Sequence, residues 1–162
     1  GAHPIAGGEK SGFLASSDTL YNGARCIVTP TEKSDPSALK KVIQLWETVG
    51  MQVSTMDIKE HDFIFAAVSH LPHVLAALLA AGTAADQLPL AGPGWLDTTR
   101  VAAGDVQLWR QIFQHNKVHV LKSVDKFAQL LASFREALGK DDMVKVTRLL
   151  ETGKKHRDSV GN

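Results

Sequence analysis

The sequence predicts a mostly α-helical fold with a small α/β portion at its N-terminal end. Up to about residue 57 the chain alternates strand and helix signals, whereas beyond it apolar residues recur at helical spacing almost throughout. The chain has 162 residues, of which 44% are hydrophobic and 22% charged, so it can bury a sizeable core. We therefore expect two parts, residues 1–56 and residues 57–162.

The first part contains a strand, a helix and a second strand. Residues 24–29 are rich in Ile and Val, as short strands are. Ser34 or Asp35 then caps a helix with Pro36 in its first turn, because both are preferred N-cap residues and proline fits the first helical turn. Gly50 ends this helix, and residues 51–56 alternate as a second strand does. Such a unit is typical of the edge of an α/β sheet.

The second part is predicted to be a series of long helices. An apolar segment over residues 63–81 indicates a helix buried on most sides, and Pro72 should bend or break it near residues 68–72. Four further segments are predicted: a loop rich in Gly and Pro (89–94), a short segment (97–103), a long helix (105–138) and a final helix (141–157). The apolar residues of the long helix cover more than a narrow stripe. We therefore expect part of it to pack against a second copy in a homodimer.

The composition excludes several kinds of protein. With 18 Lys and Arg against 17 Asp and Glu, the net charge of +1 does not favour a nucleic-acid partner. The single cysteine, Cys26, cannot form an intramolecular disulfide, and its apolar neighbours favour a small buried side chain over a nucleophile. The richest apolar run, residues 74–81, is far short of the ~20 residues of a membrane-spanning helix. We therefore expect no membrane segment and a cytoplasmic location.

Two groups of histidines could carry chemistry. His3 opens a Gly-rich stretch that carries Glu9 six residues later; it could act as a general base near neutral pH, or it could be a frayed end. His70 and His73 stand at the predicted bend. A metal site that also uses the His61-Asp62 pair is conceivable, but buried, hydrogen-bonded histidines are favoured, because no acidic or cysteine ligand stands at helical spacing beside both.

A third group is Asp97 and Arg100, which precede Trp109 on the predicted long helix. An arginine can bind a carboxylate with two parallel hydrogen bonds, and a neighbouring aspartate can hold its guanidinium in place. From these residues alone, a structural ion pair is an equally good interpretation.

Four strings in this order resemble the prephenate and arogenate dehydrogenase family: HPIAGGEKSG, CIVTPT, HDFIFAAVSHLPHVLAALL and DTTRVAAGDVQLWRQIFQHN. An ordered set of four is a specific signal, whereas one short motif is a weak one. The resemblance implies that residues 1–56 are the closing part of a truncated Rossmann-type domain and residues 57–162 a helical substrate-binding and dimerisation domain. The sequence contains no G-x-G-x-x-G, the turn that holds the pyrophosphate of NAD or NADP in such domains.

The resemblance also implies a reaction and a set of roles. The family oxidises the ring hydroxyl of prephenate by hydride transfer to NAD or NADP, while the ring loses carbon dioxide and becomes aromatic. His3 matches the histidine that hydrogen-bonds the reacting hydroxyl and helps to remove its proton, and Arg100 matches the arginine that binds a substrate carboxylate. The other residues expected at the pocket are His70, His73, Asp97 as the orienter of Arg100, Glu9 in the loop, and Trp109 from the other subunit. Gly8 stands where many relatives have threonine, which removes a hydroxyl that could contact the substrate.

Two functions of different classes follow. The first is an NAD(P)-dependent prephenate or arogenate dehydrogenase, present as a fragment that is inactive alone and binds no cofactor tightly. The second is a helical dimerisation or regulatory module that binds tyrosine or a related aromatic acid without converting it. Neither needs a metal.

Overall fold

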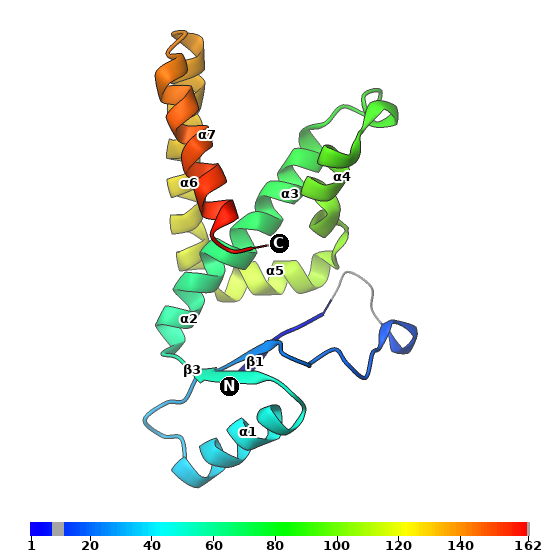
Figure 1. Cartoon of the computed structure of the whole chain (residues 1–162), viewed down its shortest axis with the longest axis vertical. Helices are drawn as coiled ribbons and strands as arrows, with labels where there is room; N and C mark the ends of the chain where they lie inside the picture. The colour runs from blue at the N-terminus through cyan, green and yellow to red at the C-terminus, as the bar shows by residue number, and fades with distance from the viewer. Residues whose placement is uncertain (8–11, 162) are drawn as a thin grey trace. The chain divides into compact units, whose positions relative to one another are not determined.

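The computed structural model describes residues 1–7 and 12–161, and they form two compact units, Gly1–Val120 and Leu121–Asn162 (Figure 1). A three-stranded sheet stands at the N-terminal end, and helices make up most of the remainder. The predicted fold class is therefore confirmed. The division predicted near residue 57 stays a prediction. The first compact unit contains both the sheet and the helices that follow it.

The sheet has the order β1-β2-β3 and is of mixed direction. Strand β2 (Arg25–Val28) pairs antiparallel with β1 (Ala2–Ile5) and parallel with β3 (Gln52–Thr55), and helix α1 (Pro36–Thr48) connects β2 to β3. The two expected strands and their helix are confirmed. Strand β1 was not expected: His3 lies within a hydrogen-bonded strand, so its interpretation as a frayed end was wrong.

Helix α1 begins and ends as its sequence predicts. The Asp35 side chain accepts a hydrogen bond of 2.8 Å from the backbone N–H of Ala38, with Pro36 in the first turn. After the helix, Gly50 has a φ of 91°, a conformation that glycine adopts without strain. These two signals place α1 against the sheet.

The core of this part lies between α1 and one face of the sheet. Cys26, Val28 and Met51 are buried there, and α1 contributes Leu39, Ile43 and Trp46. Cys26 has no exposed surface, which confirms it as a small buried side chain, and burial raises the pKa of its thiol.

The alternation of side chains along the strands decides which face carries His3. Cys26 and Val28 pack toward α1, so Ile27 between them points to the opposite face. His3 is paired with Ile27 across the antiparallel ladder, and directly paired residues lie on the same face of a sheet. The imidazole of His3 therefore lies on the face away from α1.

A continuous helical segment follows the sheet: α2 (Ile58–Phe65), a π turn (Ala66–His70) and α3 (Leu71–Gly82). Asp57 caps α2 by accepting hydrogen bonds from the N–H groups of Lys59 and Glu60. In the π turn the N–H of Leu71 donates to the carbonyl of Ala66, five residues earlier. At the place where a bend or break was predicted, the helix contains a π turn and continues without a break. Pro72 lies in the first turn of α3, where its missing N–H is tolerated.

The segment from Ile58 to Gly82 is 25 residues long and, by length and composition only, could cross a membrane. The sequence prediction considered only the uninterrupted apolar run of residues 74–81, and the expectation of no membrane segment stays a prediction. Within this chain only 22% of the most apolar part is buried. The same segment carries polar side chains that a lipid-facing helix would have to keep away from lipid, namely His61, Asp62, His70 and His73. We interpret its exposed apolar side chains as a surface for another protein chain.

The remaining elements are 3₁₀ turns at Leu88–Leu90 and Arg100–Ala103, and helices α4 (Pro93–Thr99), α5 (Val106–His115), α6 (Lys117–Gly139) and α7 (Met143–Asp158). Two predictions need correction. The expected loop over residues 89–94 includes the start of α4, and the single helix expected over residues 105–138 is divided at Asn116. The apolar periodicity continues across this residue, so the pattern could not reveal the division.

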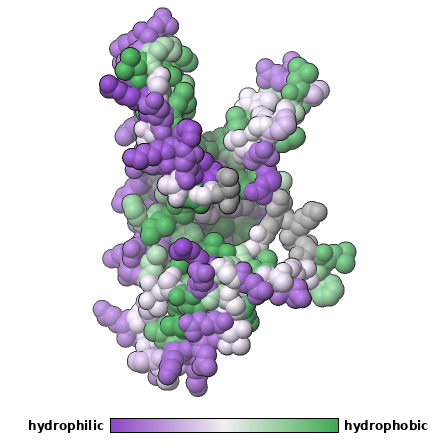
Figure 2. Space-filling view, in the orientation of Figure 1, coloured by the Kyte–Doolittle hydropathy of each residue, from purple (hydrophilic) through white to green (hydrophobic). Residues whose placement is uncertain are grey.

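In the second unit, the end of α6 is followed by a tight turn into α7. Asp141 has a φ of 54°, and the side chain of Asp142 caps α7 by accepting from the N–H of Lys145. Ala137 and Val146 are buried. Several apolar side chains of the two helices remain exposed: Leu130, Leu131, Leu138, Met143, Val144 and Leu150. Figure 2 shows apolar side chains at the surface among hydrophilic ones.

Candidate active site

The candidate site is built around a contact between His3 on β1 and His61 on α2. The Nδ1 atom of His3 lies 2.9 Å from the Nε2 atom of His61, although the two residues are 58 positions apart. The Nδ1 atom of His61 lies 3.0 Å from a carboxylate oxygen of Asp62. The ring of Phe65 packs against both imidazoles, with ring centres 4.8 Å and 4.5 Å away.

The hydrogen bonds of these three residues determine where the protons lie. An ionised carboxylate can only accept, so the Nδ1 atom of His61 donates to Asp62. The Nε2 atom of neutral His61 then carries a lone pair and accepts from the Nδ1–H of His3. This arrangement leaves the Nε2 atom of His3 unprotonated and able to accept a proton.

Asn116, the residue between α5 and α6, connects this group to His70. Its Nδ2 atom donates to the backbone carbonyl of Asp62 over 2.7 Å and to the Nδ1 atom of His70 over 3.2 Å. Asn116 is buried, and among residues 1–7 and 12–161 its Oδ1 atom has no hydrogen-bond partner. Because the Nδ1 atom of His70 accepts this hydrogen bond from Asn116, neutral His70 carries its proton on Nε2.

His73 and Trp109 form a stacked pair close by on α3 and α5. Their ring centres are 3.6 Å apart and their planes differ by 11°. His73 is buried, and its Nδ1 atom has no hydrogen-bond partner within the described part of the chain. Gly104 has no side chain that would clash with Trp109: a Cβ atom at position 104 would lie 2.8 Å from the indole nitrogen. Trp109 thus packs on His73 of its own chain, and its expected reach into a partner's pocket stays a prediction.

Three histidines of this region have lowered pKa values. Burial lowers the pKa of His3 below its ordinary value, and the neighbouring His61 lowers it further. Burial also lowers the pKa of His70, against an opposing effect of Asp62, and burial alone lowers the pKa of His73. These three imidazoles are therefore neutral near pH 7 and act through hydrogen bonds. An anionic ligand needs a positive charge from another residue.

Arg100 is the cation that the sequence offers for this purpose. It is exposed and begins the 3₁₀ turn directly after α4, while Asp97 is exposed one turn earlier. Thr99 between them is buried, and its hydroxyl donates to the carbonyl of Trp95 over 2.8 Å, which fixes the end of α4. Glu9 and its neighbour Gly8 lie outside the described residues.

The conceivable metal site at His61, Asp62 and His70 receives no support. Among residues 1–7 and 12–161, no group of three or more His, Cys, Asp or Glu side chains could hold a metal ion. His61 and Asp62 instead bond to each other and to His3.

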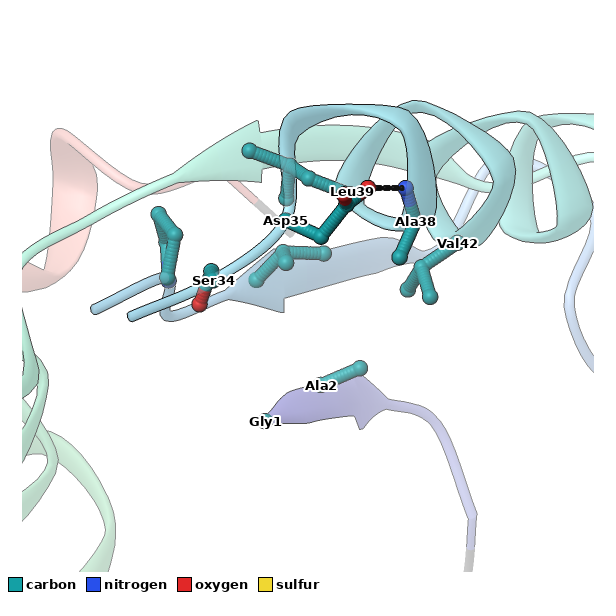
Figure 3. A pocket seen from close by; sticks show the side chains of 9 residues that line it. Gly1, Ala2, Ser34, Asp35, Ala38, Leu39 and Val42 are labelled. Carbon is teal, nitrogen blue, oxygen red and sulfur yellow. Dashed lines mark hydrogen bonds between the residues drawn. The ribbon is translucent and has the colours of Figure 1, made fainter. Parts of the chain in front are cut away.

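A cavity of about 330 Å³ lies on the other side of the sheet (Figure 3). It is an open cavity between the start of β1 and α1, whose Leu39 and Val42 line it together with Ala2 and Val28. These residues belong to the face that packs on α1, opposite to His3. The cavity is therefore separate from the candidate site.

The sequence analysis did not find all of the residues that meet here. His61 and Asp62 were noticed only as a possible metal site, although a His-Asp pair one turn after the cap at Asp57 was a usable signal. Asn116 gave no signal, because a single asparagine in a helical pattern is most often a surface residue.

Comparison with known proteins identifies the family. Residues 57–152 match the family model described as "Prephenate dehydrogenase, dimerization domain", and residues 1–55 match "Prephenate dehydrogenase, nucleotide-binding domain". The chain belongs to the prephenate dehydrogenase family. The resemblance seen in the four sequence strings is thereby confirmed.

Individual relatives agree with this assignment. The chain is 32% identical to a prephenate dehydrogenase of Bacillus subtilis over 99% of its own length and 45% of that protein. It is 30% identical to a cyclohexadienyl dehydrogenase of Zymomonas mobilis over 87% of its own length and 50% of that protein. The chain therefore spans about half the length of these curated relatives.

Solved structures share the fold over nearly the whole chain. Prephenate dehydrogenase from A. aeolicus, in complex with hydroxyphenyl propionate and NAD+, superposes with a TM-score of 0.88 and 38% identity. That match covers 98% of this chain and 58% of the other. Arogenate dehydrogenase of Synechocystis matches with a TM-score of 0.83 and 28% identity, over 98% and 60% of the two chains.

We predict that Asn116→Leu lowers the free energy of unfolding by about 2 kcal/mol, because the partly buried acceptors at His70 and at the carbonyl of Asp62 lose their donor. Gln114→Leu, at an exposed position near the end of α5, serves as the control and should change stability by less than about 0.5 kcal/mol. Urea denaturation of the two variants and the wild type checks this. Equal stability of all three proteins would contradict the role given to Asn116.

Proposed function

We propose that this chain is the substrate-binding and dimer-forming part of an NAD(P)-dependent prephenate or arogenate dehydrogenase. The observation that carries the proposal is the match, over 98% of the chain, to a prephenate dehydrogenase that holds hydroxyphenyl propionate and NAD+. That compound is an aromatic acid with a ring hydroxyl. The geometry around His3 supplies a group that can accept a proton from such a hydroxyl.

In the proposed reaction His3 receives the proton of the substrate's ring hydroxyl. Its Nε2 atom carries a free lone pair when Nδ1 donates to His61, and its lowered pKa keeps the imidazole neutral near pH 7. As the hydroxyl becomes a carbonyl, the bond between the ring and its carboxylate breaks and carbon dioxide leaves. The electron pair of that bond passes through the ring to the new carbonyl oxygen, which takes up a proton and becomes a phenol hydroxyl; the aromaticity gained drives the reaction.

NAD or NADP would accept the hydride from the carbon that bears the hydroxyl. The described residues include no Gly-rich turn for a pyrophosphate, and the sheet ends with strand β1 on one side and β3 on the other. The residues present therefore do not fit the dinucleotide by themselves. Their part is to bind the substrate and take its proton.

We assign the charge of the substrate to Arg100. His3, His70 and His73 are neutral near pH 7, so they can orient a carboxylate but cannot balance its charge. A guanidinium can bind both oxygens of a carboxylate in parallel. His73 lines the same region through its stack with Trp109 and offers its unpartnered Nδ1 atom to a ligand or a water molecule.

We predict that Arg100→Ala weakens binding of hydroxyphenyl propionate about 30- to 150-fold, since a charge-assisted bond contributes about 2–3 kcal/mol. Arg100→Lys should restore only part of the affinity, because an ammonium cannot form two parallel bonds to one carboxylate. Calorimetric titration measures both. Arg110→Ala, at an exposed position on α5, is the matched control, and thermal melts verify folding. Binding by Arg100→Ala that equals the wild type would return Arg100 to a structural role.

We predict that the 162-residue chain alone does not oxidise prephenate, because hydride transfer requires a cofactor held against the substrate. The assay follows formation of reduced NAD and of reduced NADP, with His3→Ala as the background control. Turnover above that control would contradict the prediction. Ligand binding without turnover fits both the proposed fragment and a module that binds an aromatic acid without converting it; turnover after addition of a nucleotide-binding part distinguishes the two.

We predict a homodimer whose stability depends on protein concentration, because exposed apolar side chains occur along α6 and along the helix from Ile58 to Gly82. Sedimentation over a dilution series measures the association. Leu131→Glu should weaken it, whereas Gln129→Glu adds the same charge to α6 and should have less effect. A wild-type monomer at every concentration would rule the dimer out.

A further inference from the structure

We propose that His61 and Asp62 are positioning residues that hold the proton of His3 on Nδ1 and so keep its Nε2 atom ready to accept a proton. The consequence for catalysis rests on the proposed function, in which His3 receives a proton from the substrate. The placement of the proton on His3 does not rest on it, because it follows from hydrogen bonds within this chain.

The hydrogen bonds between Asp62, His61 and His3 run in one direction. Asp62 can only accept from His61, over 3.0 Å, and this fixes the proton of His61 on Nδ1. His61 can then only accept from His3, over 2.9 Å, and this fixes the proton of His3 on Nδ1. Each residue thus determines the tautomer of the next, and the orientation begins at the carboxylate. In serine hydrolases an aspartate holds the tautomer of a catalytic histidine in the same way.

The backbone that carries Asp62 is held in place by its neighbours. Asp62 follows His61 directly on α2, and its backbone carbonyl accepts a bond from Asn116 at the junction of α5 and α6. The cap at Asp57 fixes the start of the helix one turn earlier. The Asp62 side chain is 39% exposed and that of His61 18%, so the pair lies at the edge of the site, where it can act on His3 without being sealed in the core.

Packing also holds the two imidazoles in register. Phe65, one turn after His61, contacts both rings, and the rings of His3 and His61 meet edge to face with their centres 5.2 Å apart. His3 is thus held by a hydrogen bond to His61 and by packing against Phe65. The titratable groups that face the His3–His61 pair are Asp62 and His70.

The test is the tautomer of His3 in the ¹⁵N-labelled 162-residue chain, read from long-range proton–nitrogen correlations of the imidazole above its pKa. His3 is assigned by the loss of its signals in His3→Gln. We expect a protonated, pyrrole-type Nδ1 and an unprotonated, pyridine-type Nε2 in the wild type. A proton on Nε2 of His3 in the wild type overturns the proposal, whatever the variants do.

Two variants separate positioning from mere packing. His61→Phe keeps an aromatic ring but removes the acceptor, and Asp62→Ala keeps His61 but removes the group that orients it. In both we expect the Nδ1 signal of His3 to shift away from the pyrrole-type value as protonation moves toward Nε2. His156→Phe, at an exposed histidine of α7, should leave the His3 signals unchanged. Unchanged His3 signals in folded His61→Phe and Asp62→Ala would limit the pair to anchoring α2. The measurement needs neither substrate nor cofactor, so its failure is distinct from failure of the proposed reaction.

Discussion

Asn116 holds three segments of the first unit together through one buried amide. Its Nδ2 atom bonds to the carbonyl of Asp62 on α2 and to the imidazole of His70 in the π turn, while its backbone lies between α5 and α6. A buried donor must find acceptors, so this residue restricts how α5 can lie against the helix from Ile58 to Gly82. The stack of Trp109 on His73 depends on the same placement, because one ring is on α5 and the other on α3.

The face of the sheet on which His3 lies is the second constraint. Strand alternation sends Cys26 and Val28 to the core with α1 and leaves His3 and Ile27 on the other face. The helix that follows β3 begins after only a short connection, so His61 is brought to that same face. The chemistry of the site therefore depends on two local rules, the alternation of a strand and the capping of a helix. Neither residue of the His3–His61 pair needs a special backbone conformation.

Local signals in the sequence were sufficient for much of the fold. The cap at Asp35, the turn at Gly50 and the helical spacing between them predicted α1 and its flanking strands. Strand β1 was missed because His-Pro-Ile followed by glycines lacks the alternation of a half-buried strand, and Pro4 is tolerated there only because it needs no donor at that position. The division at Asn116 was missed because apolar periodicity reports which side of a helix is buried and not where one helix ends and the next begins.

The contact of His3 with His61 joins residues 58 positions apart, and no local pattern encodes such a pairing. Family resemblance selected His3, His73 and Arg100 but did not point to Asp62 or Asn116.

The π turn gives the helix from Ile58 to Gly82 one place that can lose a residue. A π turn contains one residue more than an α-helix needs, and each residue of a helix rotates the following side chains by about 100°. Because the turn absorbs that extra residue within about the same rotation as an ordinary turn, removal of one residue between Ala66 and His70 would restore an α-helix and leave the later side chains of α3, including His73, in nearly their present direction. Most substitutions in this turn would leave that direction unchanged. A deletion within these five residues is therefore absorbed by a return to the α-helix, whereas a deletion elsewhere between the start of α2 and His73 would rotate His73 by about 100°, even when every side chain that touches a ligand is retained.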